Sequence, residues 1–297
     1  MEISRRTLLM SALAPPPAQG KLVDSHIHLF DPTRFPYHPT ATYQPKPETL
    51  DDYAKAIGGI GLDHAIVVHP EPYQDDHRYL EYCFQNEPRK GFFKGTVLFD
   101  GADPASYPRM KEIVKKWPGR IVALRVHAMN KEISAKGAIR NRDLTSPQMA
   151  QTWALATKLG LAVQMHMIPM FAPQVAALLQ KTPGATVIID HLGRYSQGTP
   201  AEYEEVLKLA KKGRVYMKFS GLGYSSKEKA PHRDLGVLAK RILDVYGPDR
   251  IIWGGLGMNK KKYAEQKESF ETVWAFTDEA TRAKIRGGNA MQLFHLG

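Results

Sequence analysis

The chain has 297 residues, of which 43% are hydrophobic, and its formal charge is +11. This composition supports a large globular core, and the single cysteine, Cys83, excludes an intramolecular disulfide. The basic residues occur in pairs such as Lys115-Lys116, with no run of five and no aromatic interleaving. The charge therefore favours small anions over nucleic acid, and no apolar stretch reaches the roughly 18 residues of a membrane span.

The first twenty residues differ from the rest of the chain. The run SRRTLL at 4–9 resembles a twin-arginine export signal, and a short apolar stretch and a proline-rich exit follow it. We therefore expect residues 1–20 to be a signal that sends the folded protein to the periplasm or outside the cell, and residues 21–297 to form the folded domain. A disordered tail on a cytoplasmic protein is the alternative, because the apolar stretch is short.

The first predicted strand, residues 23–30, carries Asp24, His26 and His28 two positions apart. Residues i, i+2 and i+4 of a strand share one face. One face of this strand is therefore expected to present a carboxylate and two imidazoles, a set that holds a metal or orients a reacting group.

A long loop, residues 31–46, follows the first strand. It contains several prolines and aromatic residues, so it is neither a helix nor a central strand. Loops of this length in compact domains are usually functional, and we expect this one to lie over the site.

Strands and helices alternate along the remaining sequence. Strands are predicted over 65–68, 94–99, 121–126, 161–166, 186–191, 215–219 and 251–253. Helices are predicted over 49–57, 76–86, 107–117, 148–159, 173–180, 200–211, 235–246, 263–276 and 279–294. Eight short apolar strands followed by helices predict an α/β fold, a single-domain (β/α)8 TIM barrel.

Polar residues gather at the carboxyl ends of these strands, where a barrel of this kind places its active site. They are His69, Arg125, His127, His166, His191, Lys218 and Ser220. His26, His28, His166 and His191 form a set that suits zinc, with four nitrogen ligands or three and a water. Arg125, Lys218 and Arg194 add positive charge, which favours an anionic substrate such as a carboxylate.

Several motifs together resemble the amidohydrolase superfamily. They are DSHIH at 24–28, His166, IDHLG at 189–193, RIIWG at 250–254 and GNAMQLF at 288–294. More narrowly, residues 22–294 are similar to the amidohydrolase-related TIM-barrel hydrolases, a group that contains sugar lactonases and the pyrone-dicarboxylate lactonase. This resemblance implies hydrolysis of a lactone, ester or amide, with the four histidines binding a metal or polarising the substrate.

The sequence departs from this family at the eighth strand. The family pattern there is W-G-S/T-D-W-P, whose aspartate activates water, whereas this chain has WGGLGM at 253–258. Leu256 stands at the aspartate position and cannot take a proton. Another histidine, His69 or His127, then has to serve as the base, or the chemistry needs no activated water, or the barrel only binds a ligand.

The most favoured function is hydrolysis of a small anionic lactone or cyclic ester, with one divalent ion, zinc or manganese, or without a metal. The alternatives are a lyase or isomerase, such as a decarboxylase, and a barrel that has lost its catalytic activity and only binds a ligand. The expected site consists of His28, His69, His127 and His191 as catalytic residues, Arg125, Lys218, Ser220, Arg194 and Asn259 as substrate-binding residues, and His26, His28, His166 and His191 as metal ligands.

Overall fold

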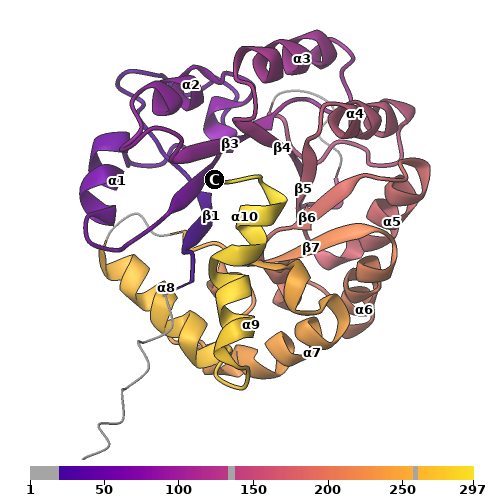
Figure 1. Ribbon diagram of the computed structural model, residues 1–297. Helices are drawn as coiled ribbons and strands as arrows, with labels where there is room; N and C mark the ends of the chain where they lie inside the picture. The colour runs from indigo at the N-terminus through magenta and orange to yellow at the C-terminus, as the bar shows by residue number, and fades with distance from the viewer. Residues whose placement is uncertain (1–19, 133–137, 257–259) are drawn as a thin grey trace, which may run out of the picture.

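The computed structural model describes residues 20–132, 138–256 and 260–297, in which eight parallel strands follow one another around a barrel (Figure 1). The predicted (β/α)8 barrel is confirmed, whereas the signal expected in residues 1–20 lies, except for Gly20, outside the described residues. The strands are β1 (Val23–Ile27), β2 (His64–Val68), β3 (Phe93–Leu98), β4 (Ile121–Ala128), β5 (Ala162–Met167), β6 (Thr186–Ile189), β7 (Arg214–Phe219) and β8 (Ile251–Trp253).

Helices surround the strands and cover their outer face, which explains why the strands are apolar on both sides (Figure 1). They are α1 (Leu50–Ile57), α2 (Arg78–Gln85), α3 (Ser106–Lys116), α4 (Pro147–Lys158), α5 (Ala172–Lys181), α6 (Pro200–Lys208), α7 (Gly236–Tyr246) and α8 (Lys260–Val273). Thr49 caps α1 and Thr199 caps α6, each in a capping box with the acidic residue three positions later. Each helix or strand predicted before residue 279 agrees with the structure to within a few residues.

Side chains help to close the barrel between β8 and β1. The Ser25 hydroxyl donates to the Trp253 carbonyl at 2.6 Å, and the Gly255 amide donates to the Asp24 carboxylate at 2.8 Å. The hydroxyl of Tyr263, on α8, donates to the other oxygen of Asp24 at 2.7 Å. The expectation that Asp24 shares a functional face with the two histidines therefore needs revision, because its carboxylate joins the first and last strands. Burial raises the pKa of Asp24 to about 6.

The C-terminal segment fills the opposite end of the barrel from the strand tips. Ala290 and Phe294 pack against a small cluster of buried strand residues that includes Val23, Ile66 and Ile252, and α10 (Asn289–Leu293) lies across the barrel axis in Figure 1. The sequence predicted one helix over 279–294, but the structure has α9 (Glu279–Ala283), a π-helical turn and then α10. Gly287 in that turn packs directly on the Lys21 backbone.

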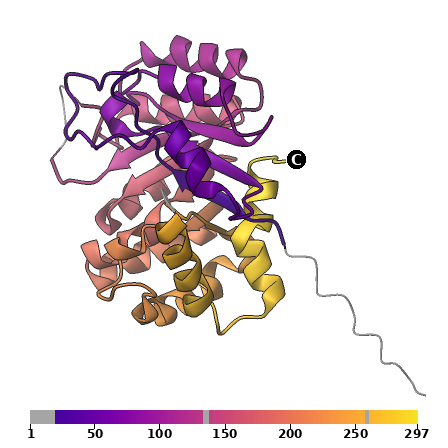
Figure 2. The same ribbon diagram turned by 90° about the vertical axis from the view of Figure 1, so that its left-hand side faces the viewer.

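The long loop after β1 lies at the other end of the barrel, away from α10 (Figure 2). A two-way backbone pairing of Phe30 with Glu48 closes its base, at 2.8 and 2.9 Å. Its aromatic residues hold it down: the Tyr37 ring lies 5.1 Å from that of Tyr73, and the Phe35 ring lies 5.0 Å from that of Tyr79. This placement leaves the strand tips beneath the loop.

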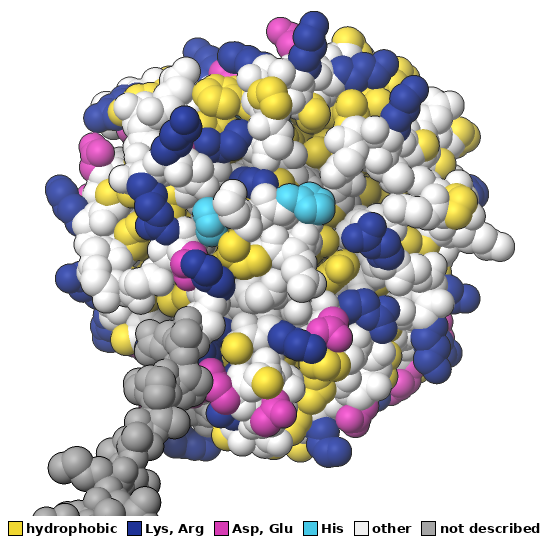
Figure 3. Space-filling view, viewed as in Figure 1, with side chains coloured by type: hydrophobic (Ala, Val, Ile, Leu, Met, Phe, Trp, Pro, Cys, Tyr) yellow, Lys and Arg dark blue, Asp and Glu magenta, His cyan; other side chains and the backbone are white. Residues whose placement is uncertain are grey.

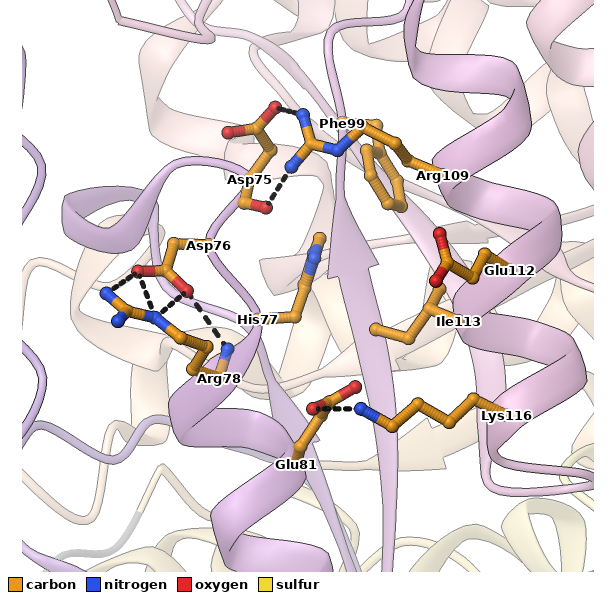
Figure 4. Close-up of a pocket in the computed structure, with 10 residues that line it drawn as sticks. All are labelled: Asp75, Asp76, His77, Arg78, Glu81, Phe99, Arg109, Glu112, Ile113 and Lys116. Carbon is orange, nitrogen blue, oxygen red and sulfur yellow. Dashed lines mark hydrogen bonds and ion pairs between the residues drawn. The ribbon is translucent and has the colours of Figure 1, made fainter.

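A second cavity, of about 300 Å³, lies between α2 and α3 (Figure 4). Its charged walls are largely paired internally: Asp75 with Arg109, Asp76 with Arg78, and Glu81 with Lys116. On the face of the molecule shown in Figure 3, Lys and Arg side chains are spread around the outline with acidic side chains among them. In the described part of the chain, no helix combines the length and apolar character needed to cross a membrane.

The contact of Gly287 with the first strand generates a prediction for stability. A Cβ at Gly287 would lie 1.9 Å from the Lys21 carbonyl oxygen, so Gly287→Ala must displace backbone. We expect it to lower the free energy of unfolding by about 3 kcal/mol and Tm by roughly 5–10 °C, measured by thermal and urea denaturation. The neighbouring Gly288→Ala is the control, because its Cβ would meet only Ala283 O at 3.6 Å. Equal stability of the two variants would contradict this packing.

Candidate active site

A cavity of about 500 Å³ opens at the carboxyl ends of the strands. Its lining contains seven residues that the sequence analysis singled out: His28, Arg125, His127, His166, His191, Arg194 and Leu256. It also contains residues that the sequence analysis did not select: Phe30, Tyr43, Gln44, Pro45, Glu71, Arg140 and Tyr224. The structure thus gathers residues from seven strand ends and from the long loop around one space.

Asp190 lies beneath this cavity, fully buried, and collects the positive groups of the barrel interior. One carboxylate oxygen lies 3.1 Å from the Lys218 ammonium, and the other accepts from Arg125 Nη2 at 3.3 Å and from Gln164 Nε2 at 3.0 Å. Burial alone would raise the pKa of Asp190, but the Lys218 ammonium and the His26 ring hold it well below its usual range. Asp190 is therefore the anionic centre of the site.

Lys218 has a different place from the one its sequence position suggested. It was expected to bind substrate, but its side chain is fully buried and its ammonium donates to the Ser25 carbonyl at 3.1 Å, besides pairing with Asp190. It is also absent from the described lining of the cavity. Lys218 therefore supports the floor of the site.

His26 and His28 face each other through their Nε2 atoms, 3.2 Å apart. The Nδ1 of His28 donates to the Val68 carbonyl at 2.7 Å, which leaves its Nε2 without a proton when the ring is neutral. The Nδ1 of His26 lies 3.4 Å from Lys218 Nζ and 3.6 Å from Asp190. Burial and then the nearby Arg125 lower the pKa of His28 to about 3, so this ring is neutral at pH 7.

His191 begins an unusual turn after β6. The four residues 191–194 have φ between 51° and 62°, a left-handed conformation that costs roughly 1 kcal/mol or more for each non-glycine residue. The turn brings the Arg194 guanidinium over the Tyr224 ring, 3.9 Å from its centroid. Nδ1 of His191 lies 2.8 Å from the Ser220 hydroxyl, so Ser220, expected to bind substrate, instead orients this ring.

Gly221 makes that orientation possible. Its φ is +56°, and a Cβ there would lie 2.6 Å from His191 Nδ1. Only glycine combines this backbone conformation with such a close approach to the imidazole.

Arg194 and His166 contact each other directly. The Nε and Nη2 atoms of Arg194 donate to His166 Nε2 at 3.1 and 2.8 Å. The other nitrogen of His166 lies 3.4 Å from His127 Nδ1, and this pair is in register on β5 and β4. His166 was expected to ligate a metal, but the nitrogen that would do so is engaged by a guanidinium.

Two other expected residues are not part of the cavity as described. His69 Nε2 bonds to the Gln74 carbonyl at 3.0 Å, and its ring packs 4.4 Å from that of His77 and does not line the cavity. Asn259 lies outside the described residues. Leu256, in contrast, lies on the cavity wall, with its amide donating to the His26 carbonyl at 3.2 Å.

The donor atoms fit a divalent cation, although with a different ligand set from the one predicted. Among the described residues, His26, Asp190 and His191 each offer a ligand atom within 4.8 Å of the others. Two nitrogens that each lie about 2.1 Å from one tetrahedral ion are roughly 3.4 Å apart, which agrees with the 3.2 Å between the Nε2 atoms of His26 and His28. Asp190 Oδ1 faces the Lys218 ammonium at 3.1 Å, so a bound ion would share this oxygen with Lys218.

Glu71 is the most important residue that the sequence analysis missed. It follows β2 by three residues, is 2% exposed, and lines the cavity. Gln74 Nε2 donates to one of its carboxylate oxygens at 2.9 Å and Thr42 Oγ1 to the other at 3.1 Å. No local pattern marks this glutamate, because its place depends on contacts with the distant loop that holds Thr42.

Comparisons with known proteins found similar sequences and similar folds. The chain is 25% identical over 235 residues to a 4-sulfomuconolactone hydrolase from Hydrogenophaga intermedia, covering 78% of this chain and 72% of that one. The fold superposes on a crystal structure described as a probable 2-pyrone-4,6-dicarboxylic acid hydrolase from Acinetobacter baumannii with citric acid bound. The TM-score is 0.74, with 20% identity and coverage of 93% and 99% of the two chains.

A third comparison concerns metal binding. An amidohydrolase from Burkholderia multivorans, solved with bound zinc, has a TM-score of 0.69 and 20% identity, and covers 93% of this chain and 100% of its own. Finally, the amidohydrolase family model (Amidohydro_2) matches residues 23–296, almost the whole described barrel. This chain therefore belongs to the amidohydrolase family and is a hydrolase-type TIM barrel.

Proposed function

We propose that this protein hydrolyses a small anionic lactone or cyclic ester in the cavity at the strand tips. The observation that carries the proposal is the make-up of the cavity wall, where three arginines and four histidines face a single carboxylate among the described residues. These residues are Arg125, Arg140, Arg194, His28, His127, His166, His191 and Glu71. The relatives named above as lactone hydrolases act on substrates of this kind, which supports the same class here.

The charge of the wall favours an anion bound among neutral imidazoles. Burial, with the nearby Arg125 and further cationic groups, lowers the pKa of His127 and His166 well below the usual range. These rings are therefore neutral at pH 7 and serve as hydrogen-bond donors and acceptors, while the arginines carry the positive charge. A substrate carboxylate meets Arg140 at the rim, where Arg140 bonds to Thr42 of the long loop, and the lactone carbonyl is left for the floor of the cavity.

Hydrolysis requires a group that takes a proton from water, and we assign this role to Glu71. Water adds to the acyl carbon as Glu71 accepts one of its protons, and the ring C–O bond then breaks as Glu71 returns that proton to the leaving oxygen. The Leu256 side chain on the cavity wall cannot accept a proton. Among the described residues that line the cavity, Glu71 is the one carboxylate. The His28 ring is anchored to the carbonyl of Val68, the last residue of β2, and Glu71 follows Val68 by three residues.

A divalent ion fits the same floor, where His26, Asp190 and His191 would hold it and the Nε2 of His28 lies 3.2 Å from that of His26. When bound, such an ion polarises a carbonyl oxygen and acidifies a bound water. Lys218 and Arg125 already balance the charge of Asp190, so a reaction that relies on arginines and imidazoles without an ion is the alternative. The proposal also includes export, because the run at 4–9 resembles a twin-arginine signal.

The proton-acceptor role of Glu71 predicts the behaviour of Glu71→Gln. We expect kcat for lactone opening to fall by about 10²–10⁴-fold, with little change in KM, because the amide keeps the shape but not the basicity. The assay is a panel of anionic lactones in ¹⁸O-labelled water, where hydrolysis places one ¹⁸O in the product and isomerisation places none.

A second variant separates lost basicity from lost shape. Adding Leu256→Asp to Glu71→Gln supplies a carboxylate to the same cavity from the end of β8, and it should restore part of kcat. Wild-type turnover by Glu71→Gln alone would show that another group takes the proton. Turnover of the panel without ¹⁸O uptake would exclude hydrolysis.

The revised ligand set predicts which histidines retain a metal. After chelator treatment and reloading with Zn²⁺ or Mn²⁺, the full chain should hold one ion. At an ion concentration 100 times Kd, unfolding should cost about 2.7 kcal/mol more than in the apoprotein. His26→Asn should lose the ion, whereas His166→Asn should keep it, because Arg194 engages His166 Nε2. Elemental analysis and thermal shift measure both effects. Loss of the metal from both variants would restore the set predicted from the sequence, which contains His26 and His166.

The neutral histidines also predict how stability depends on pH. Burial lowers the pKa of His28 and of His77 to about 3, against about 6.5 in the unfolded chain, so the unfolded chain binds more protons below pH 6.5. The free energy of unfolding of the apoprotein should therefore fall as the pH drops from 6.5 toward 3, by about 1.4 kcal/mol per unit for each such histidine. Asp24, with its raised pKa, opposes this between pH 6 and 4.

His77 provides a control outside the active site, because its Nε2 accepts from the Leu98 amide and its ring lies in the second cavity (Figure 4). In His77→Gln the amide oxygen can accept the same hydrogen bond. The slope of the unfolding free energy against pH should therefore decrease by the contribution of one histidine, about 1.4 kcal/mol per pH unit. An unchanged slope in urea titrations would mean that His77 is not held neutral.

A further inference from the structure

Three side chains on the cavity wall form a directed hydrogen-bond chain that the reaction described above does not use. Arg194 contacts His166, and His166 contacts His127, across β5 and β4. The direction of each bond follows from which groups can donate, and it determines where the protons lie.

A guanidinium has donors but no acceptor. Because Arg194 donates to His166 Nε2 through two nitrogens, at 3.1 and 2.8 Å, that nitrogen carries no proton. The neutral His166 ring therefore has its proton on Nδ1, which lies 3.4 Å from His127 Nδ1 and donates to it. His127 in turn carries its proton on Nε2.

That Nε2–H group has no hydrogen-bond partner among the described residues, although His127 is only 6% exposed. Nε of Arg125, which is 3% exposed, is likewise without a partner in the described part of the chain. Buried donors are nearly always paired, and leaving one unpaired costs about 1–3 kcal/mol. Both residues line the cavity, and they are two positions apart on β4, so their side chains leave the same face of the strand.

We propose that His127 Nε2–H and Arg125 Nε–H bind the acyl oxygen of the substrate and stabilise the negative charge that forms on it when water adds. In this step the water oxygen bonds to the acyl carbon, its proton goes to Glu71, and the carbonyl electron pair moves onto the oxygen held by the two donors. Arg194 is a positioning residue, because it fixes the His127 proton through His166. This inference rests on the proposed lactone hydrolysis.

The place of Arg125 favours the acyl oxygen over a remote carboxylate of the substrate. Its Nη2 is bound to Asp190 at the floor of the site. After burial, its charge is the main cause that lowers the pKa of His28, His127 and His166, so the guanidinium lies close to these imidazoles. Arg140 bonds to Thr42 in the loop at the rim, at 2.7 Å, and offers a remote carboxylate its own site. Preorganised donors at a developing oxyanion contribute typically 10²–10³-fold to kcat.

The proton positions are tested without any substrate. In the full chain labelled with ¹⁵N-histidine, two-dimensional NMR at pH 7 should show His127 protonated on Nε2 and His166 on Nδ1, with His127→Gln identifying the His127 signals. Arg194→Met, which removes the donors, should shift His127 toward the other tautomer, and Arg194→Lys, which keeps a donor without an acceptor, should preserve it. A His127 ring that is protonated on Nδ1 in the wild type would overturn the inference.

Kinetics on the same variants test the catalytic role. His127→Asn, whose amide reaches only the position of Nδ1, should lower kcat about 100-fold with KM within threefold of wild type. His127→Gln, whose amide nitrogen reaches the position of Nε2, should retain most of kcat. Equal losses in the two variants, or a rise in KM alone, would overturn it. If no lactone is opened by the wild type, the proposed hydrolysis fails, while the tautomers remain a separate result.

Discussion

The buried carboxylate of Asp190 is the interaction on which the site depends. An unpaired charge at this depth would be very costly, so the barrel interior supplies Lys218, Arg125 and Gln164 as direct partners and places His26 beside them. Each partner comes from a different strand. The charge therefore ties β1, β4, β5 and β7 to β6 at their carboxyl ends, and it sets the height and direction of the groups that form the floor of the cavity.

Buried hydrogen bonds also close the barrel and fix the orientation of the histidines. Asp24 joins β1 to the residue after β8 and to α8, while His28 is held by the Val68 carbonyl and His191 by the Ser220 hydroxyl. Each ring thus has one nitrogen fixed by the protein and the other left for chemistry. The backbone of residues 191–194 is strained because it has a left-handed conformation, and the surrounding packing holds it there. As a result, the Arg194 side chain lies on the cavity wall.

The family aspartate is missing in this chain, and the structure shows what surrounds the gap. Leu256 lies on the cavity wall, and its side chain has no group that can accept a proton. Glu71 brings a carboxylate to the same space from the end of β2, held by the amide of Gln74 and by Thr42 of the long loop. In the proposed reaction, Glu71 therefore takes the proton-accepting role that the family resemblance gives to an aspartate at position 256.

The sequence by itself determined the barrel, because alternating apolar strands and amphipathic helices are local patterns, and it identified the strand ends as the site. It also selected seven residues of the cavity wall, since histidine and arginine at strand ends are visible in sequence order. Only the tertiary structure decided their roles. Lys218 is buried beneath the floor of the cavity, His69 bonds to Gln74, and Arg194 donates to His166 Nε2. These outcomes depend on distances between residues far apart in the chain, which no local pattern encodes.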